Sequence, residues 1–120
     1  SLVETNSLTY QVALWAIDNK IYKTNVRNIK NGSSYLIKKL KNSGDDFHGG
    51  KYTNAILIKL TSFQATENLK NYLFKKKIYI RNSFPAPISN CIRVSLASVK
   101  KLSKFFNEYS RWKKSFIKNN

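Results

Sequence analysis

Apolar residues recur along the chain at two spacings, and each spacing predicts a kind of element. Between 20 and 41 the interval is helical, with Ser33 filling a gap in the apolar stripe; the apolar positions are Tyr22, Val26, Ile29, Leu36, Ile37 and Leu40. A second helical stripe follows the capping residue Ser98 and contains Leu102, Phe105, Phe106, Tyr109, Trp112 and Phe116. An aromatic stripe at this spacing is typical of core packing.

Shorter segments predict strands. Residues 53–60 (TNAILIKL) are apolar on both faces at their centre, which favours a strand inside a sheet. Residues 78–81 and 91–95 alternate between aliphatic and polar side chains, as a half-buried strand does. Residues 45–52 contain two adjacent glycines and predict a loop or a short edge strand.

Two further helices complete the predicted fold. Residues 8–17 (LTYQVALWAI) are apolar almost all round, which predicts a buried helix. Another helix runs from a cap at Ser62 or Thr66 to about Lys77. The predicted class is α+β: a small, mostly antiparallel sheet with helices packed on it, preceded by a buried helix and a long connecting helix over 20–42.

Each of the last two predicted strands carries one arginine. Ile78 and Ile80 lie on one side of the first strand, so Arg81 points to the other side. By the same alternation Arg93 points away from its aliphatic neighbours in 91–95. A face that carries both guanidinium groups is either an ordinary solvated surface or the wall of an anion site, because arginine matches carboxylates and phosphates with a two-pronged fork.

The net charge of +16 allows a nucleic-acid or acidic-membrane partner. However, 18 of the 22 basic residues are lysines, and the chain also has 14 Asn and 11 Ile. All three residue types have A/T-rich codons, so base composition alone can produce this excess. The lysines are also spread along the chain rather than clustered, so nucleic acid is the less favoured partner.

Length and cysteine usage set further bounds. The 120 residues suit one domain, and a chain that begins with Ser1 and contains no Met is expected to be a piece of a longer protein. A single Cys91 excludes an internal disulfide and favours a reducing compartment, which predicts a cytoplasmic protein. His48 is also alone, so a zinc site is excluded. No apolar run reaches the ~20 residues of a membrane span.

Several local strings, taken in order, resemble the C-terminal part of fold-type I pyridoxal-phosphate aminotransferases, in the branch of histidinol-phosphate aminotransferase. The family's helix start "N-S-L-A-Q" is similar to Thr5–Gln11, and its "A-N-F-L-L" strand is similar to Thr53–Leu57. Its "L-x-x-x-G-I-L-V-R" segment resembles Leu73–Arg81, and its "x-L-R-I-S-x-G" strand resembles Cys91–Ala97. The resemblance covers nearly the whole chain.

The resemblance implies that a longer parent protein has two domains with different roles. Residues 1–19 would end the large domain, and 20–120 would form the small C-terminal domain. Arg93 would bind the carboxylate of an amino-acid substrate, and Arg81 a second anion such as a phosphate. Pyridoxal phosphate would be bound by the large domain of the same polypeptide, with no cofactor-binding or catalytic residue in this segment, which alone would be inactive. The parent would be a homodimer.

The sequence departs from the family pattern at several positions. Ala97 replaces a glycine, Lys77 stands where a glycine precedes "I-L-V-R", and Asn31-Gly32 lies where the long helix commonly has an arginine. Three alternatives stay open: a decarboxylase on the same scaffold, a freestanding basic nucleic-acid-binding module that stacks bases on Tyr79 and Phe84, and a purely structural domain.

Overall fold

The computed structural model describes residues 19–119. Its elements are α2 (Asn19–Asn42), β1 (Asp46–Gly49), β2 (Ala55–Lys59), α3 (Phe63–Phe74), β3 (Cys91–Ser95) and α4 (Val99–Asn119). The helix predicted over 8–17, and with it the assignment of the N-terminal segment to a large domain, lies outside the described residues.

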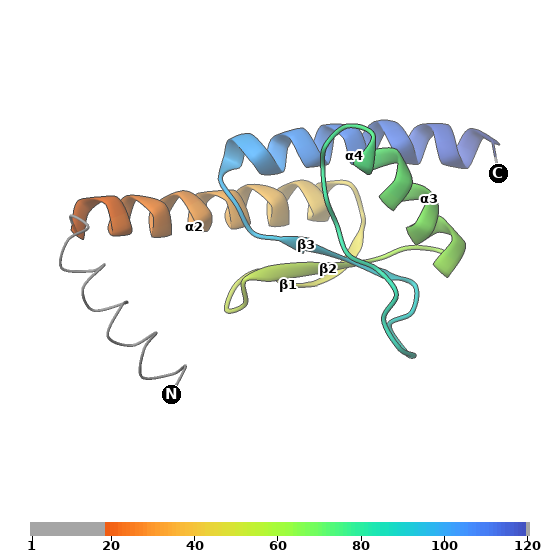
Figure 1. Ribbon diagram of the computed structural model, residues 1–120, viewed down its shortest axis with the longest axis horizontal. Coiled ribbons are helices and arrows are strands. Elements are labelled where there is room, and N and C mark those ends of the chain that lie inside the picture. The colour runs from red at the N-terminus through yellow and green to blue at the C-terminus, as the bar shows by residue number, and fades with distance from the viewer. Residues whose placement is uncertain (1–18, 120) are drawn as a thin grey trace.

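The three strands form one antiparallel sheet in the order β1-β2-β3. Helices α2 and α4 run side by side in the same direction over one face of this sheet, and α3 packs against α4 and β3 (Figure 1). The predicted α+β class, with a small antiparallel sheet and helices packed on it, is confirmed. Residues 45–52, for which the sequence left two possibilities, contain the edge strand β1.

The core lies between the sheet and the helices. Alternate residues of the two longer strands point into it, as the period of a strand requires, and each helix contributes one stripe. Its most deeply buried apolar members are Leu36, Leu40, Ile56, Ile58, Leu69, Leu73, Ile92, Phe105 and Tyr109. The aromatic stripe of α4 belongs to this core, with Tyr109 stacked between Phe105 and Trp112.

Only the C-terminal half of the apolar stripe on α2 is buried. Leu36 and Leu40 are fully buried, whereas Tyr22, Val26 and Ile29 are exposed because this end of the helix extends beyond the sheet (Figure 1). The helix is continuous through Gly32. A Cβ atom at Gly32 would lie 1.8 Å from the backbone oxygen of Ala97, so the glycine permits a close approach between α2 and the chain entering α4.

The prediction of a full strand over 78–81 is wrong. Helix α3 begins after Ser62, whose hydroxyl oxygen accepts a hydrogen bond from the Ala65 amide, and ends at Phe74 rather than Lys77. The chain then turns through Lys77, which has a φ of 62°, and the Ile78 amide donates to the carbonyl of Leu73. The Ile78 amide is therefore not available to pair with β3, and the segment forms a bridge with β3 only at Arg81.

Candidate functional site

One face of the sheet carries no helix among the described elements (Figure 1). Ile56 and Ile58 of β2 point into the core, so Ala55, Leu57 and Lys59 point to the opposite, open face. Strand β3 alternates in the same way, with Ile92 and Val94 in the core. Arg93 therefore lies on the open face, where it is half-buried.

Arg81 and Arg93 face each other directly across this edge of the sheet. The Arg81 amide donates to the Arg93 carbonyl at 3.1 Å, and the Arg93 amide donates to the Arg81 carbonyl at 2.8 Å. Residues that exchange both hydrogen bonds in an antiparallel pair carry their side chains on the same face, with Cα atoms about 5.5 Å apart. The sequence interpretation that both arginines leave by one face agrees with this geometry.

The arginine pair continues a row of residues across the whole sheet. His48 of β1 is opposite Leu57 of β2, and Leu57 is opposite Arg93 of β3. Asp46 of β1 lies one row away, with a carboxylate oxygen 4.0 Å from His48 Nε2. The open face thus presents three basic side chains in one row with a leucine between them.

Neither arginine has a carboxylate within 4.0 Å among the described residues, where the ion pairs involve Lys76, Arg111, Lys113 and His48. Like charges that are directly opposite each other on a sheet are destabilising. A bound anion would relieve this repulsion and satisfy the guanidinium donors. The pair therefore has unused capacity to bind a carboxylate or phosphate.

A cavity of about 540 Å³ lies on the same face beside Arg93. The loop between Arg81 and β3 supplies Phe84 and Ile88, and the sheet supplies the floor; the lining residues are His48, Gly49, Thr53, Asn54, Ala55, Leu57, Phe84, Ile88 and Arg93. Arg81 is not among them, so a ligand inside this cavity would contact only Arg93 of the two predicted site residues. An apolar wall with one cation suits a small organic anion.

Side-chain hydrogen bonds hold the loop that carries Phe84 and Ile88. At its start, Asn82 is buried and donates to Thr66 Oγ1 at 3.0 Å and to Glu67 Oε1 at 2.6 Å. At its end, Asn90 donates to the Leu60 carbonyl at 3.1 Å. Both ends of the loop are thereby fixed to the sheet and α3, which keeps the apolar wall beside Arg93.

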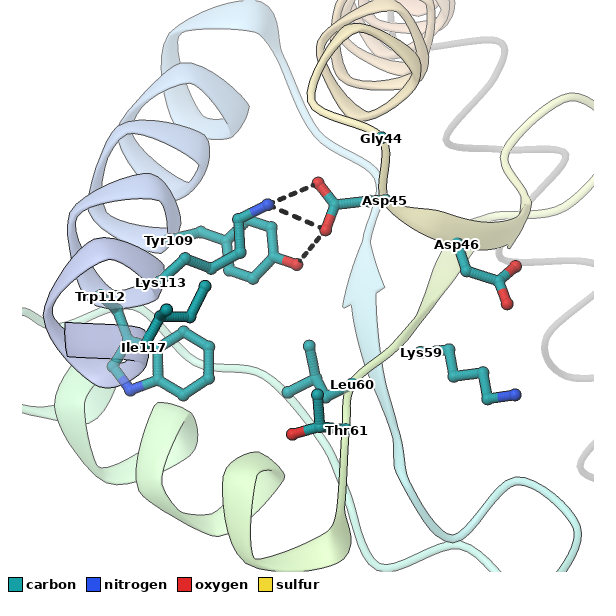
Figure 2. Close-up of a pocket in the computed structure, with 10 residues that line it drawn as sticks. All are labelled: Gly44, Asp45, Asp46, Lys59, Leu60, Thr61, Tyr109, Trp112, Lys113 and Ile117. Atoms are coloured by element: carbon teal, nitrogen blue, oxygen red, sulfur yellow. Dashed lines mark hydrogen bonds and ion pairs between the residues drawn. The ribbon is translucent and has the colours of Figure 1, made fainter. Parts of the chain in front are cut away.

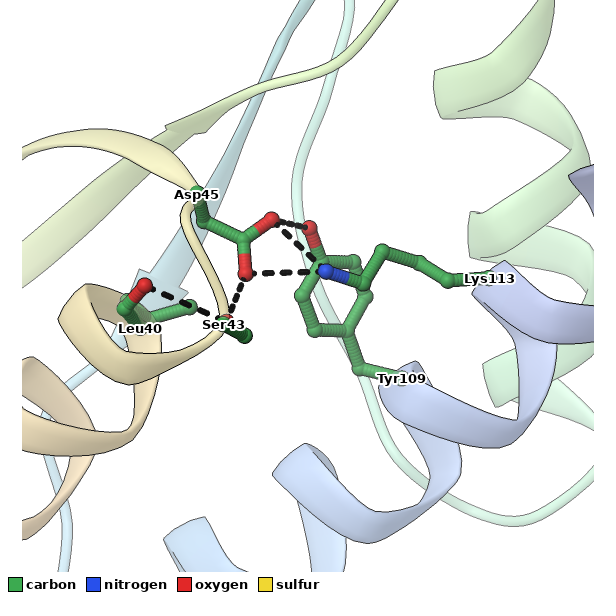
Figure 3. A network of polar contacts seen from close by, with 5 residues as sticks. All are labelled: Leu40, Ser43, Asp45, Tyr109 and Lys113. Atoms are coloured by element: carbon green, nitrogen blue, oxygen red, sulfur yellow. Dashed lines mark hydrogen bonds and ion pairs between the residues drawn. The ribbon is translucent and has the colours of Figure 1, made fainter.

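The sequence did not indicate a second polar cluster, which joins the turn after α2 to α4. The Asp45 carboxylate, whose side chain is 8% exposed, accepts hydrogen bonds from Tyr109 Oη at 2.6 Å and from Lys113 Nζ at 3.0 Å to each oxygen. The Ser43 hydroxyl also donates to it (Figure 3). Burial first, and then the hydrogen bond to Asp45, raise the pKa of Tyr109 well above its usual range. No sequence motif links residues that lie 64 positions apart.

This cluster borders a cavity of about 330 Å³ that Trp112 and Ile117 also line (Figure 2). Tyr109, Lys113 and Ser43 together engage both oxygens of Asp45, so the carboxylate has no hydrogen-bonding capacity left for a ligand. A buried charge that is fully paired in this way fixes the relative position of two elements. We assign the cluster a structural role.

Glu108 on α4 is a further buried carboxylate. It pairs with Lys76 Nζ at 3.2 Å and with Arg111 Nη1 at 2.7 Å. Burial acts to raise its pKa, but the hydrogen bonds and charges of Lys76 and Arg111 outweigh burial and lower the pKa overall. The lowered pKa means that the folded protein binds this proton less tightly than the unfolded chain does.

A pH-dependent contribution to stability follows from Glu108. Since its pKa is lowered on folding, its stabilisation is present above the unfolded value of about 4.3 and is lost as the pH falls through the folded value. We expect the difference in unfolding free energy between the wild type and Glu108→Gln to be largest near pH 7 and to shrink below about pH 4.3. Urea unfolding at several pH values measures this. A difference that stays constant down to pH 3 would contradict the assignment.

The two aromatic residues of the nucleic-acid alternative do not share a site. Phe84 lines the cavity on the open face, whereas Tyr79 lines a different cavity beside α4. Within residues 19–119 there is no group of three or more His, Cys, Asp or Glu that could hold a metal ion. None of the described helices is both long and apolar enough to cross a bilayer.

Comparison of the sequence with protein-family models and with curated proteins found no match.

Proposed function

We propose that this chain is the small domain of a pyridoxal-phosphate-dependent aminotransferase, and that its role is to bind the anionic groups of an amino acid or amino-acid phosphate. The observation that carries the proposal is the Arg81–Arg93 pair, which lies on the open face of the sheet without a carboxylate partner among the described residues. The α+β architecture and the resemblance of the strings around both arginines support it.

Each arginine has a distinct proposed role. Arg93 is half-buried beside the open-face cavity and binds the α-carboxylate with its guanidinium fork. Arg81 is exposed at the outer end of the row and binds a second anion such as a phosphate. Two fixed contacts orient the substrate, which lowers the entropic part of the barrier when the reacting groups lie on another domain.

The described residues do not fit a cofactor site. From Lys23 onward the described lysines are exposed, apart from Lys113, which is half-buried and paired with Asp45. In the proposal the cofactor is therefore held by a large domain outside residues 19–119, and this chain supplies substrate binding alone. A homodimeric, cytoplasmic parent belongs to the same proposal, and the buried free thiol of Cys91 suits a reducing compartment.

The proposal predicts anion binding that depends on the arginine pair. In a titration of the 120-residue chain followed by NMR, O-phosphoserine should bind more tightly than serine, because only the former engages both guanidinium groups. Arg93→Gln should weaken binding of O-phosphoserine about tenfold or more, since a hydrogen bond to a charged group contributes about 1.5–3 kcal/mol. Arg27→Gln, an exposed arginine on α2, is the matched control and should leave the affinity unchanged.

The enzyme class needs a separate test on the longer protein. The coding sequence upstream of Ser1 should encode a Ser-x-x-Lys segment, and the purified parent should transfer an amino group between an amino acid and a 2-oxo acid. Release of carbon dioxide instead would favour the decarboxylase alternative. An upstream region without such a lysine would refute the aminotransferase assignment.

A further inference from the structure

A separate cavity of about 390 Å³ lies between the turn after α3 and the first turns of α4. Apolar residues that belong to the core form its floor; they are Ile80, Val94, Leu102 and Phe105. Small-molecule sites commonly have volumes of roughly 300–1,000 Å³. Neither Arg81 nor Arg93 lines this cavity, so it is distinct from the proposed substrate site.

The rim of the cavity is positively charged. Lys77, Lys101 and Lys104 line it, and no acidic residue does. All three lysines are exposed, and no ion pair involves them among the described residues. Glu108, one turn beyond Lys104, is already paired with Lys76 and Arg111 and does not offset this charge. The rim therefore complements an anion with more than one negative charge, such as a phosphate.

An aromatic ring stands beside these lysines. Tyr79 lines the cavity and is 70% exposed. Among the described residues its ring contacts one other aromatic ring, that of Phe74, edge-on, at 5.6 Å between centroids and 65° between planes. An edge contact leaves most of the ring surface open. Stacking of a base on such a ring contributes about 1–3 kcal/mol.

We propose that this cavity binds a free mononucleotide, with the phosphate among the three lysines and the base against Tyr79. The lysines surround one cavity of small-molecule size instead of following a track, which favours a single nucleotide over a nucleic-acid strand. Independently of the proposed aminotransferase function, this site would make the chain a nucleotide-binding protein.

A titration of the 120-residue chain with AMP tests the role of the rim. The variant Lys101→Gln/Lys104→Gln should raise the Kd for AMP about tenfold or more. The matched control Lys100→Gln/Lys114→Gln removes the same charge from exposed positions of α4 outside the cavity and should change the Kd less than about twofold. Arg93→Gln should not affect AMP binding, which separates this site from the arginine pair.

A second variant tests the ring. Tyr79→Leu should raise the Kd for AMP at least about fivefold, whereas binding of inorganic phosphate should not change. The absence of saturable AMP binding, or equal losses in the two lysine variants, would overturn the proposal. Two further results would also overturn it. The first is that inorganic phosphate binds as tightly as AMP and Tyr79→Leu has no effect on AMP binding. The second is that the affinity for oligonucleotides grows with their length and is unchanged in the Lys101→Gln/Lys104→Gln variant.

Discussion

Replacing Asp45 with alanine is expected to lower the free energy of unfolding by about 3 kcal/mol. The substitution leaves the buried Tyr109 hydroxyl without its acceptor and the Lys113 ammonium without its counter-charge. Loss of one partner from a buried ion pair typically costs about 3–5 kcal/mol. Lys113, 26% exposed, can recover part of its hydration, which places the expected loss at the lower end.

Thermal and urea unfolding measure this loss, which corresponds to a fall in Tm on the order of 10 °C. Asp46→Ala is the matched control, because that side chain is 62% exposed and should contribute less than about 0.5 kcal/mol. In a Tyr109→Phe background the effect of Asp45→Ala should shrink, since the hydroxyl that loses its acceptor is already absent. Equal effects of Asp45→Ala and Asp46→Ala would show that the cluster contributes nothing specific.

Replacing Gly32 with alanine is expected to destabilise the protein by about 2 kcal/mol, although helix propensity alone predicts the opposite sign. Alanine within a helix is favoured over glycine by about 1 kcal/mol. The new Cβ would lie 1.8 Å from the Ala97 oxygen and 2.9 Å from its carbonyl carbon. Both atoms are backbone, so α2 and the start of α4 must separate, which costs more than the propensity gain.

Asn31→Ala is the control for Gly32→Ala, because Asn31 is exposed on the same helix. Alanine there should stabilise the protein by a few tenths of a kcal/mol. Chemical denaturation measures the change in unfolding free energy for both variants. Both gain helix propensity, but only Gly32→Ala also introduces the steric conflict with Ala97. Stabilisation by both substitutions would mean that the contact at Ala97 relaxes at no cost.

The arginine pair shows what a local pattern can predict about the site. The alternation of aliphatic and polar residues predicted that Arg81 and Arg93 both point away from the apolar side of their segments, because successive side chains of an extended segment point to opposite faces. The register that sets them directly opposite each other depends on the turn after α3 and on the loop that ends at Asn90. Long-range contacts fix both, so the pairing could not be predicted.

The buried carboxylates illustrate the opposite case. Asp45 follows the glycine that ends α2, a position that predicts a polar turn residue, and Glu108 lies within a strongly basic helix. Their partners lie far away in the sequence: Tyr109 and Lys113 for Asp45, and Lys76 for Glu108. A sequence pattern carries no information on such pairs, because each requires two elements to have already packed together.

The sequence by itself determined the α+β class, the positions of α2, α3 and α4, and the faces of β3, since the periods of apolar residues are local properties of the chain. Tertiary structure alone decided that 78–81 forms a bridge instead of a strand, that Gly32 marks a close contact, and which half of α2 is buried. Each of these outcomes depends on which segments come into contact in the folded protein. Packing between segments that are distant in the sequence decides those contacts.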